Sequence, residues 1–210
     1  MSNALDYDGL VRLLRAGAAR VKDGAEQLGR LDSAIGDGDH GVAMTRAMQA
    51  LEQGIDGCQD KTPQALFKGV AWSVMSIDAG STGPLMGSLL MGMMEPVGDA
   101  DRVDCPLLAS MFEAGLAKLR AISKAEVGDK TMIDALVPAV AALRAAAAGQ
   151  RVADALDKAA TAAEEGAERT KDFQARFGKA RNLGERSLGH QDPGATSTAM
   201  LLRGFAEGAS

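Results

Sequence analysis

The chain has 210 residues, a formal net charge of −5, and 46% hydrophobic but only 3% aromatic residues. This length is enough for one substantial core, so we expect a single domain over residues 1–210. The acidic balance, with no basic stripe in the sequence, argues against a nucleic-acid partner. No run of about 18 apolar residues occurs, and residues 1–10 hold no apolar signal region, so we expect a cytoplasmic protein with no membrane association.

The composition favours helices. Alanine, leucine and methionine are abundant, and β-branched residues do not alternate with polar ones, which predicts an all-α fold. Cys58 and Cys105 lack the spacing of a zinc site or a redox pair. We therefore expect two buried, reduced thiols.

Helical periodicity, interrupted by glycine and proline clusters, predicts eight helices. Their connections are short, about 2–10 residues for most, which favours antiparallel neighbours and an up-and-down arrangement. The connections that follow the first, third, fifth and seventh helices then meet at one end. The expected helices span residues 6–30, 41–53, 62–78, 84–95, 104–123, 131–148, 151–170 and 194–207.

The unusual loop sequences all fall at that one end. Residues 35–41, 78–83, 127–131 and 171–194 are rich in glycine and polar residues, whereas the loops at the opposite end are bland. This coincidence predicts a functional site at the end where the four glycine-rich loops meet.

Acidic residues crowd the first of these loops. Residues 31–41 read LDSAIGDGDHG and place Asp32, Asp37 and Asp39 within eight positions. Carboxylates so close repel one another unless a hard cation lies between them, which points to Mg²⁺ or Ca²⁺. A capped turn is the alternative, but it explains one aspartate rather than three. A helix precedes the glycines, which disfavours a dinucleotide fingerprint, and the position-12 glutamate of an EF-hand is missing.

The second loop precedes a helix. Residues 79–87 read AGSTGPLMG and offer free amides and the hydroxyls of Ser81 and Thr82 as an anion cradle at a helix N-terminus. Close helix packing through the small residues is the alternative, and both can hold at once.

The third loop, residues 128–131, reads GDKT and lacks the spacing of a P-loop. We expect Asp129 or Thr131 to cap the next helix. Met132, just inside that helix, offers an apolar surface to a flat ring.

The fourth loop precedes the last helix. Residues 189–197 read GHQDPGATS and place Asp192 as the N-cap and Pro193 at the first helical position. The preceding stretch is the densest positive run of the chain, which indicates either a solvated loop or a clamp over a phosphate site. His40 and His190 fall at the same end, and we assign neither a proton-transfer role. The positive run contains Lys171, Arg176, Lys179, Arg181 and Arg186.

Together these motifs predict a metal–polyphosphate site without a P-loop and without a base-activated nucleophile. In order and spacing they also resemble the L subunits of dihydroxyacetone kinases (DhaL), over essentially the full chain. The resemblance implies an eight-helix up-and-down antiparallel barrel with the nucleotide site at one end. The motifs that carry it are residues 31–41, 80–87, 128–132 and 183–197.

By this resemblance, Asp32, Asp37 and Asp39 would hold two Mg²⁺ ions that bridge the phosphates of ADP or ATP. Lys179 stands where a bacterial relative has arginine, and Ser123 where it has glycine. A lysine holds a phosphate as a point charge rather than as a fork, which predicts a looser clamp. The residues that match nucleotide-lining positions are His40, Gly41, Val42, Ser81, Thr82, Met132, Lys179, Asp192, Pro193 and Gly194.

The resemblance implies half of an enzyme, because in this family a separate K subunit holds the short ketose as a hemiaminal on a histidine. We expect phosphoryl transfer from a Mg-bound nucleotide in this chain to dihydroxyacetone or a similar ketose in a K subunit. The favoured donor scheme keeps ADP as a cofactor, rephosphorylated by a phosphohistidine protein of the phosphotransferase system. Exchange of ATP is the alternative scheme.

Two other functions would use the same residues. One is a nucleotide-sensing module that binds a transcriptional regulator and transfers nothing. The other is a metal phosphohydrolase, for which the sequence offers no convincing water-activating base.

Overall fold

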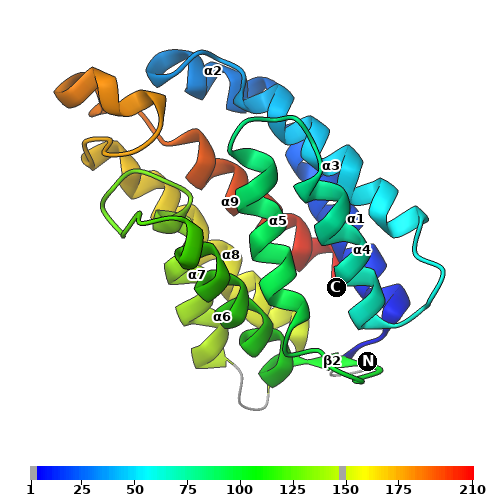
Figure 1. Cartoon of the computed structure of the whole chain (residues 1–210). Coiled ribbons are helices and arrows are strands. Elements are labelled where there is room, and N and C mark those ends of the chain that lie inside the picture. The colour runs from blue at the N-terminus through cyan, green and yellow to red at the C-terminus, as the bar shows by residue number, and fades with distance from the viewer. Residues whose placement is uncertain (1–3, 147–149) are drawn as a thin grey trace.

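A computed structural model describes residues 4–146 and 150–210. Within these ranges the chain forms nine α-helices, two 3₁₀ helices and one pair of two-residue strands (Figure 1). In chain order they are β1 (Ala4–Leu5), α1 (Tyr7–Asp23), α2 (Ala25–Ile35), α3 (His40–Asp56), α4 (Pro63–Met75), α5 (Thr82–Met94), β2 (Val103–Asp104), α6 (Cys105–Ile122), α7 (Ile133–Ala146), α8 (Val152–Arg169), η1 (Thr170–Asp172), η2 (Lys179–Ser187) and α9 (Pro193–Gly208).

The all-α prediction is confirmed, but the predicted count of eight helices is wrong. The helix expected over residues 6–30 is two helices, α1 and α2, which meet at Gly24. A Cβ at Gly24 would lie 2.6 Å from the sulfur of Met200, so the side chain of Met200 on α9 packs closely against the junction of α1 and α2. The other helices begin and end within three residues of expectation. Residues 147 and 148 of the helix expected over 131–148 lie outside the described residues.

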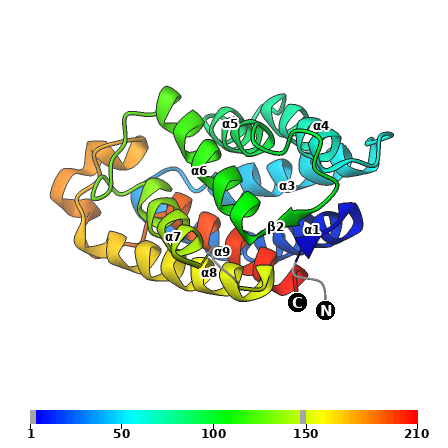
Figure 2. The same cartoon turned by 90° about the horizontal axis from the view of Figure 1, so that it is seen from below.

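Eight of the helices, α1 and α3 to α9, form a closed ring. Each packs against its neighbours in chain order, α1 packs against α3, and α9 packs against α1 to close the ring. Helix α2 is not part of the ring; it packs across α3 and α9. Seen from below, α4 to α6 lie on one side of the molecule and α7 to α9 on the other (Figure 2).

Successive ring helices run in opposite directions. The connections α2–α3, α4–α5, α6–α7 and α8–α9 all line one cleft, so alternate helices end together. Antiparallel pairing of β1 with β2, which joins Leu5 to Val103, lies at the far end beside the N-terminus (Figure 1). The fold therefore brings the four glycine-rich loops together, as the loop pattern predicted.

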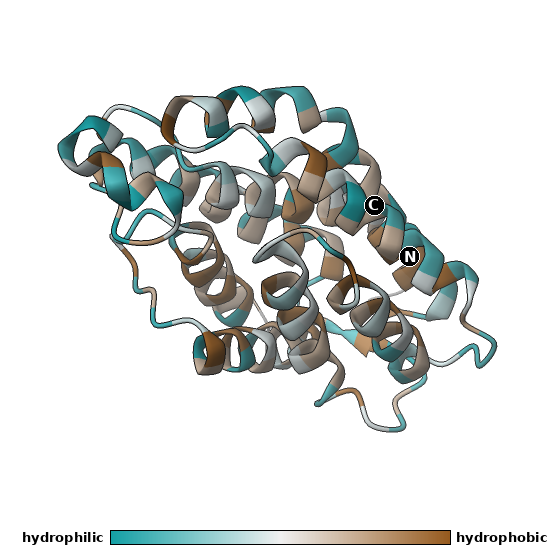
Figure 3. Ribbon diagram, turned by 45° about the horizontal axis from the view of Figure 1, so that its top comes forward, coloured by the Kyte–Doolittle hydropathy of each residue, from teal (hydrophilic) through white to brown (hydrophobic). Residues whose placement is uncertain are grey.

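The core fills the ring with leucine, alanine, methionine and a few aromatic side chains, among them Phe67 and Phe205, both almost fully buried. Cys58 and Cys105 are buried and free, as expected. Hydrophilic residues dominate η2, at the left of Figure 3, whereas hydrophobic residues concentrate in the ring helices. Within the described ranges, no helix combines the length and the apolar character that crossing a bilayer requires.

Residues 171–190, which we call the basic segment, connect α8 to α9 at the cleft end. The sequence predicted an irregular loop, whereas the structure places η2 within it. Its two ends meet, because Gly189 N–H donates to the carbonyl of Lys171 at 2.8 Å. The basic segment is therefore a closed loop folded over one end of the ring.

Helices α1 and α9 cross closely where they close the ring, and a substitution at the crossing tests this contact. A Cβ at Gly204 would lie 2.6 Å from the Cα of Gly17, so we expect Gly204→Ala to lower the free energy of unfolding by about 1–3 kcal/mol in urea denaturation. The control is Gly29→Ala in α2, where the nearest atom is 3.6 Å away. That change should leave stability equal or raise it by about 0.5–1 kcal/mol. Equal losses in both variants would contradict a close crossing.

Candidate functional site

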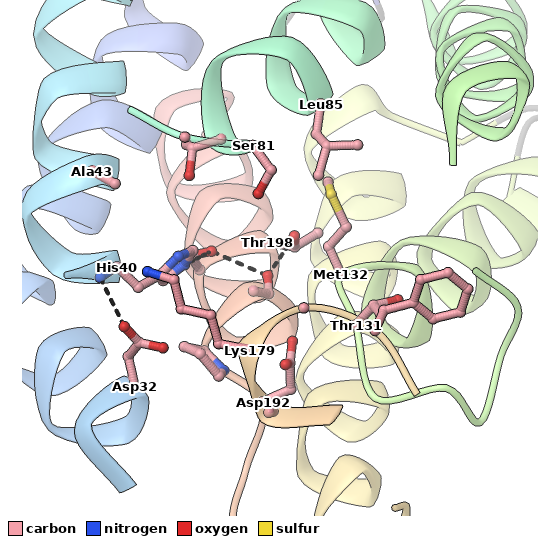
Figure 4. A pocket seen from close by; sticks show the side chains of 18 of the residues that line it. Asp32, His40, Ala43, Ser81, Leu85, Thr131, Met132, Lys179, Asp192 and Thr198 are labelled. Atoms are coloured by element: carbon pink, nitrogen blue, oxygen red, sulfur yellow. Dashed lines mark hydrogen bonds between the residues drawn. The ribbon is translucent and has the colours of Figure 1, made fainter. Parts of the chain in front are cut away.

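A cleft of about 450 Å³ opens at the end of the ring where the glycine-rich loops meet. Side chains from α2, α3, α5, α7, α9 and the basic segment point into it (Figure 4). One part is polar and acidic, and another is formed by Leu85, Met86, Leu119, Met132 and Ile133. Its volume and its division into polar and apolar parts suit a ligand of nucleotide size.

The acidic cluster, Asp32, Asp37 and Asp39, forms the polar part of the cleft. One carboxylate oxygen from each residue can be chosen so that all three lie within 4.8 Å of one another. Asp32 comes from the last turn of α2, and the other two come from the turn before α3. Three hard oxygen donors that converge and remain open to solvent fit Mg²⁺. The sequence predicted this convergence, and the structure brings all three residues together.

Lys179, on the basic segment, reaches across to this cluster. Its ammonium donates to Asp37 and lies 3.4 Å from Asp39 Oδ2. The hydrogen bond from Lys179 lowers the pKa of Asp37, and the same bond raises the pKa of Lys179. All three side chains are exposed, so this pairing contributes little to stability and leaves the carboxylates free to exchange partners.

His40 begins α3 and lies in the wall of the cleft. Its backbone N–H donates to Asp32 Oδ2 at 3.1 Å, and its Nε2 lies 3.0 Å from Ser197 Oγ on α9. Burial lowers the pKa of His40, although the charges of Asp32 and Asp39 oppose this shift. The imidazole is therefore neutral at neutral pH and acts as a hydrogen-bonding group of fixed position.

The start of α9 forms the floor of the cleft. Asp192 is the N-cap, as predicted, and its Oδ2 accepts from Ala195 N–H at 2.6 Å. Burial raises the pKa of Asp192 to about 7, partly offset by the Ala195 hydrogen bond and the positive charge of Lys130. Pro193 follows in the first turn, where its missing N–H is harmless.

The α4–α5 connection forms the opposite wall. Helix α5 begins at Thr82, two residues before the expected start, and Ser81 is its N-cap. The Ser81 side chain makes no capping hydrogen bond, and Ser81 and Thr82 line the cleft (Figure 4). The first amide of α5 is not free, because Thr82 N–H donates to the carbonyl of Ala79 at 3.1 Å, and Pro84 has no N–H. The hydroxyls of Ser81 and Thr82, rather than a row of free amides, are therefore the donors that this wall offers to an anion.

The α6–α7 connection resolves the capping alternatives. Thr131 Oγ1 accepts from Ile133 N–H at 3.2 Å, at the start of α7. Asp129 instead accepts from Glu126 N–H at 2.8 Å, within the loop. Of the two candidate caps, Thr131 is therefore the one that serves α7.

Two residues of the expected nucleotide set do not line this cleft. Gly41 and Val42 border a neighbouring pocket between α2 and α3. A Cβ at Gly41 would lie 2.1 Å from the carbonyl oxygen of Ala25, so Gly41 permits α2 to approach α3. The expected residues that do line the cleft are Asp32, Asp37, Asp39, His40, Ser81, Thr82, Met132, Lys179, Asp192, Pro193 and Gly194.

The sequence prediction also left out several cleft residues. Ser197 and Thr198 follow Gly194 by three and four positions, and helical spacing alone would have placed them on its face. Phe177 and Lys130 carried no such signal, because their position depends on contacts between loops that are distant in the sequence.

Comparison with known proteins identifies the family of the chain. A model of the DAK2 domain matches residues 34–207, and the chain therefore belongs to the DAK2-domain family. Within that family it is a homologue of DhaL subunits. It is 36% identical to the ADP-binding subunit DhaL of PEP-dependent dihydroxyacetone kinase 1 from Listeria innocua, over 94% of both chains. It is 37% identical to the DhaL subunit of Escherichia coli, over 85% of this chain and 86% of that one.

Longer kinases contain a similar region. The L-erythrulose 1-kinase of Mycolicibacterium smegmatis is 38% identical over 88% of this chain, which spans 33% of that protein. The crystal structure of the C. freundii dihydroxyacetone kinase in complex with AMP-PNP and Mg²⁺ matches with a TM-score of 0.69 and 29% identity, over 93% of this chain and 33% of that one.

The raised pKa of Asp192 makes a prediction about stability. In the folded chain this pKa is about 7, whereas in an unfolded chain it is about 3.9. Protonated Asp192 therefore contributes stability to the folded chain that is fully present below about pH 4 and is lost as the pH rises through about 7. Without divalent metal, we expect the free energy of unfolding of the wild type, relative to Asp192→Asn, to fall between pH 4 and pH 8. Asparagine retains the N-cap, and a difference that does not change with pH would contradict the prediction.

Proposed function

We propose that this chain is the nucleotide-binding subunit of a short-ketose kinase and presents a Mg-bound phosphoryl group to a ketose in a separate K subunit. The observation that carries the proposal is the convergence of three carboxylates beside a cleft of nucleotide size. Similarity to DhaL subunits over almost the whole chain supports the same conclusion.

Different residues would bind the metal ions and the phosphates of the nucleotide. Asp32, Asp37 and Asp39 would hold two Mg²⁺ ions, which would neutralise charge on the phosphates and on the transferring group. The hydroxyls of Ser81 and Thr82, at the start of α5, would donate to phosphate oxygens.

The apolar part of the cleft would hold the base of the nucleotide. Leu85 on α5 and Met132, directly before α7, point toward a common space (Figure 4). Lys179 would follow the phosphates as a mobile cation, because its present carboxylate partners are exposed. Gly41 and Val42 would act indirectly, through the contact of α2 with α3 that orients His40.

Transfer needs a second protein in this proposal. Ser197 Oγ lies 3.0 Å from His40 Nε2 but also donates to the carbonyl of Gly194 at 3.1 Å, and we assign this pair a structural role. The chain would act as donor and positioning subunit rather than through a nucleophile of its own. The relatives of similar length are named as subunits, whereas the longer kinases span about three times this length. A K subunit that carries dihydroxyacetone, or a related ketose such as erythrulose, would complete the enzyme.

The favoured donor scheme keeps ADP as a cofactor that a phosphohistidine protein rephosphorylates. The names of the relatives support it, since the full-length matches are PEP-dependent or, in Lactococcus lactis, PTS-dependent kinases. Tight ADP in the purified protein that does not exchange with added nucleotide would support this scheme. Free exchange of ATP and ADP would support an ATP-dependent kinase instead.

Metal-dependent nucleotide binding tests the site directly. In calorimetry we expect ADP to bind in the presence of Mg²⁺, and Asp37→Asn to weaken this binding at least about tenfold because it removes a charged metal ligand. The control is Asp78→Asn, which neutralises an exposed aspartate within the α4–α5 loop that does not line the cleft. Binding that is independent of Mg²⁺, or equal losses in both variants, would contradict the proposed metal site.

Reconstitution tests the reaction. The purified chain, a cognate K subunit, Mg²⁺ and a short ketose should yield the sugar phosphate when the phosphohistidine protein is supplied, and Asp37→Asn should yield none. Product with ATP alone would identify the ATP-dependent scheme. Nucleotide binding without product from either donor would overturn the kinase proposal and favour a sensing module that binds a regulator.

A further inference from the structure

Lys130 is a buried lysine whose role the proposed function does not explain. The residue is 2% exposed, yet it lies in the wall of the cleft between the acidic floor and α7. Its ammonium donates to the carbonyl of Thr170 at 2.5 Å and to the carbonyl of His190. A buried ammonium is costly unless such hydrogen bonds replace its hydration.

The backbone at Lys130 is also unusual. Within the described ranges it is the one residue other than glycine with a positive φ, 63°. That conformation is unfavourable for an L-residue with a long side chain and persists only where the surroundings enforce it. The strain and the burial together indicate that the fold holds this ammonium in one place.

The two carbonyls that Lys130 binds lie at opposite ends of the basic segment. Thr170 directly precedes the segment, and His190 is its last residue. Two further hydrogen bonds close the same loop: Gly189 N–H to the carbonyl of Lys171, and Asp192 N–H to Thr170 Oγ1, both 2.8 Å. Lys130 therefore joins the α6–α7 connection to the point where the basic segment closes on itself.

A second contact ties the middle of the segment to the same connection. The N–H of Arg176 donates to the carbonyl of Asp129 at 3.1 Å. The next three residues, Phe177 to Lys179, then line the cleft, and Lys179 reaches the acidic cluster (Figure 4). The position of Lys179 thus depends on an anchor at residues 129 and 130, far from it in sequence.

We propose that Lys130 is a positioning residue: its ammonium closes the basic segment at both ends, so that the segment delivers Lys179 to the acidic cluster and the nucleotide phosphates. The anchoring itself is independent of the proposed function. Its consequence for nucleotide affinity rests on that function.

Limited proteolysis tests the anchoring without any nucleotide. The basic segment contains five trypsin sites, at Lys171, Arg176, Lys179, Arg181 and Arg186. We expect Lys130→Met to speed cleavage at these sites about tenfold or more, because loss of hydrogen bonds from a charged group favours local opening. The matched control, Lys124→Met, removes an exposed lysine from the same connection and should cleave like the wild type.

A second variant covers the case in which Lys130→Met does not fold. Thr170→Val removes the hydroxyl that accepts from Asp192 N–H and leaves Lys130 in place, so it should also speed cleavage within the segment. Mass spectrometry locates the cuts. Cuts spread over the whole chain, or a rate equal to that of Lys124→Met, would overturn the proposal and leave Lys130 with a general role in stability.

A double-mutant cycle then tests the link to Lys179. If Lys130 acts through the placement of Lys179, Lys130→Met and Lys179→Met together should weaken Mg–ADP binding no more than about twofold beyond the stronger single variant. Fully additive losses would overturn the link. Should the wild type bind no Mg–ADP at all, the proposed function fails, while the proteolysis still decides whether Lys130 anchors the segment.

Discussion

Mutual repulsion among Asp32, Asp37 and Asp39 is the constraint on which the rest of the site depends. Three carboxylate oxygens within 4.8 Å of one another raise the free energy of the turn between α2 and α3 unless cations compensate them. The chain supplies one such cation from Lys179, a residue about 140 positions away. A divalent metal is the stronger partner for the same oxygens, so the cluster favours a ligand that brings metal with it.

The ring of helices holds the acidic turn in place against this repulsion. Its closure between α1 and α9 leaves no free edge, and short connections hold alternate helix ends together. Each of four connections contributes a different chemistry to the cleft: carboxylates, a helix N-terminus with hydroxyls, a buried lysine, and a capped helix start. The cleft is therefore a product of the ring rather than of any single motif.

Buried charge underlies the floor of the cleft. Burial lowers the pKa of Lys130 and raises that of Asp192, because it disfavours the charged form of each residue. The attraction between the Lys130 ammonium and the Asp192 carboxylate acts in the opposite direction and favours both charged forms. Such a network is costly unless its hydrogen bonds are complete, and the described ranges hold no buried side-chain nitrogen or oxygen without a hydrogen-bond partner. This completeness explains how the protein keeps charged and polar groups buried beneath the cleft.

Local patterns in the sequence were sufficient for the helices, the Asp192 cap and the convergence at one end. Helical periodicity and capping act over a few residues, so they can be read directly from the chain. The division of the first helix at Gly24 was missed because one helical pattern was assigned to the whole of residues 6–30. Gly41 was assigned to the nucleotide by resemblance to DhaL subunits, whereas its near neighbour in the structure is the backbone of Ala25 on α2.

The sequence by itself determined three local features: three aspartates close together in the chain, hydroxyls before a proline, and a capped last helix. Only the tertiary structure decided which of them share a cleft and what holds the basic segment in place. The physical reason is the separation along the chain of the residues that interact. Charge repulsion and helix capping act between residues that are close in the chain, whereas the Lys130 and Lys179 contacts join residues 40 to 142 positions apart, which only the closed ring brings together.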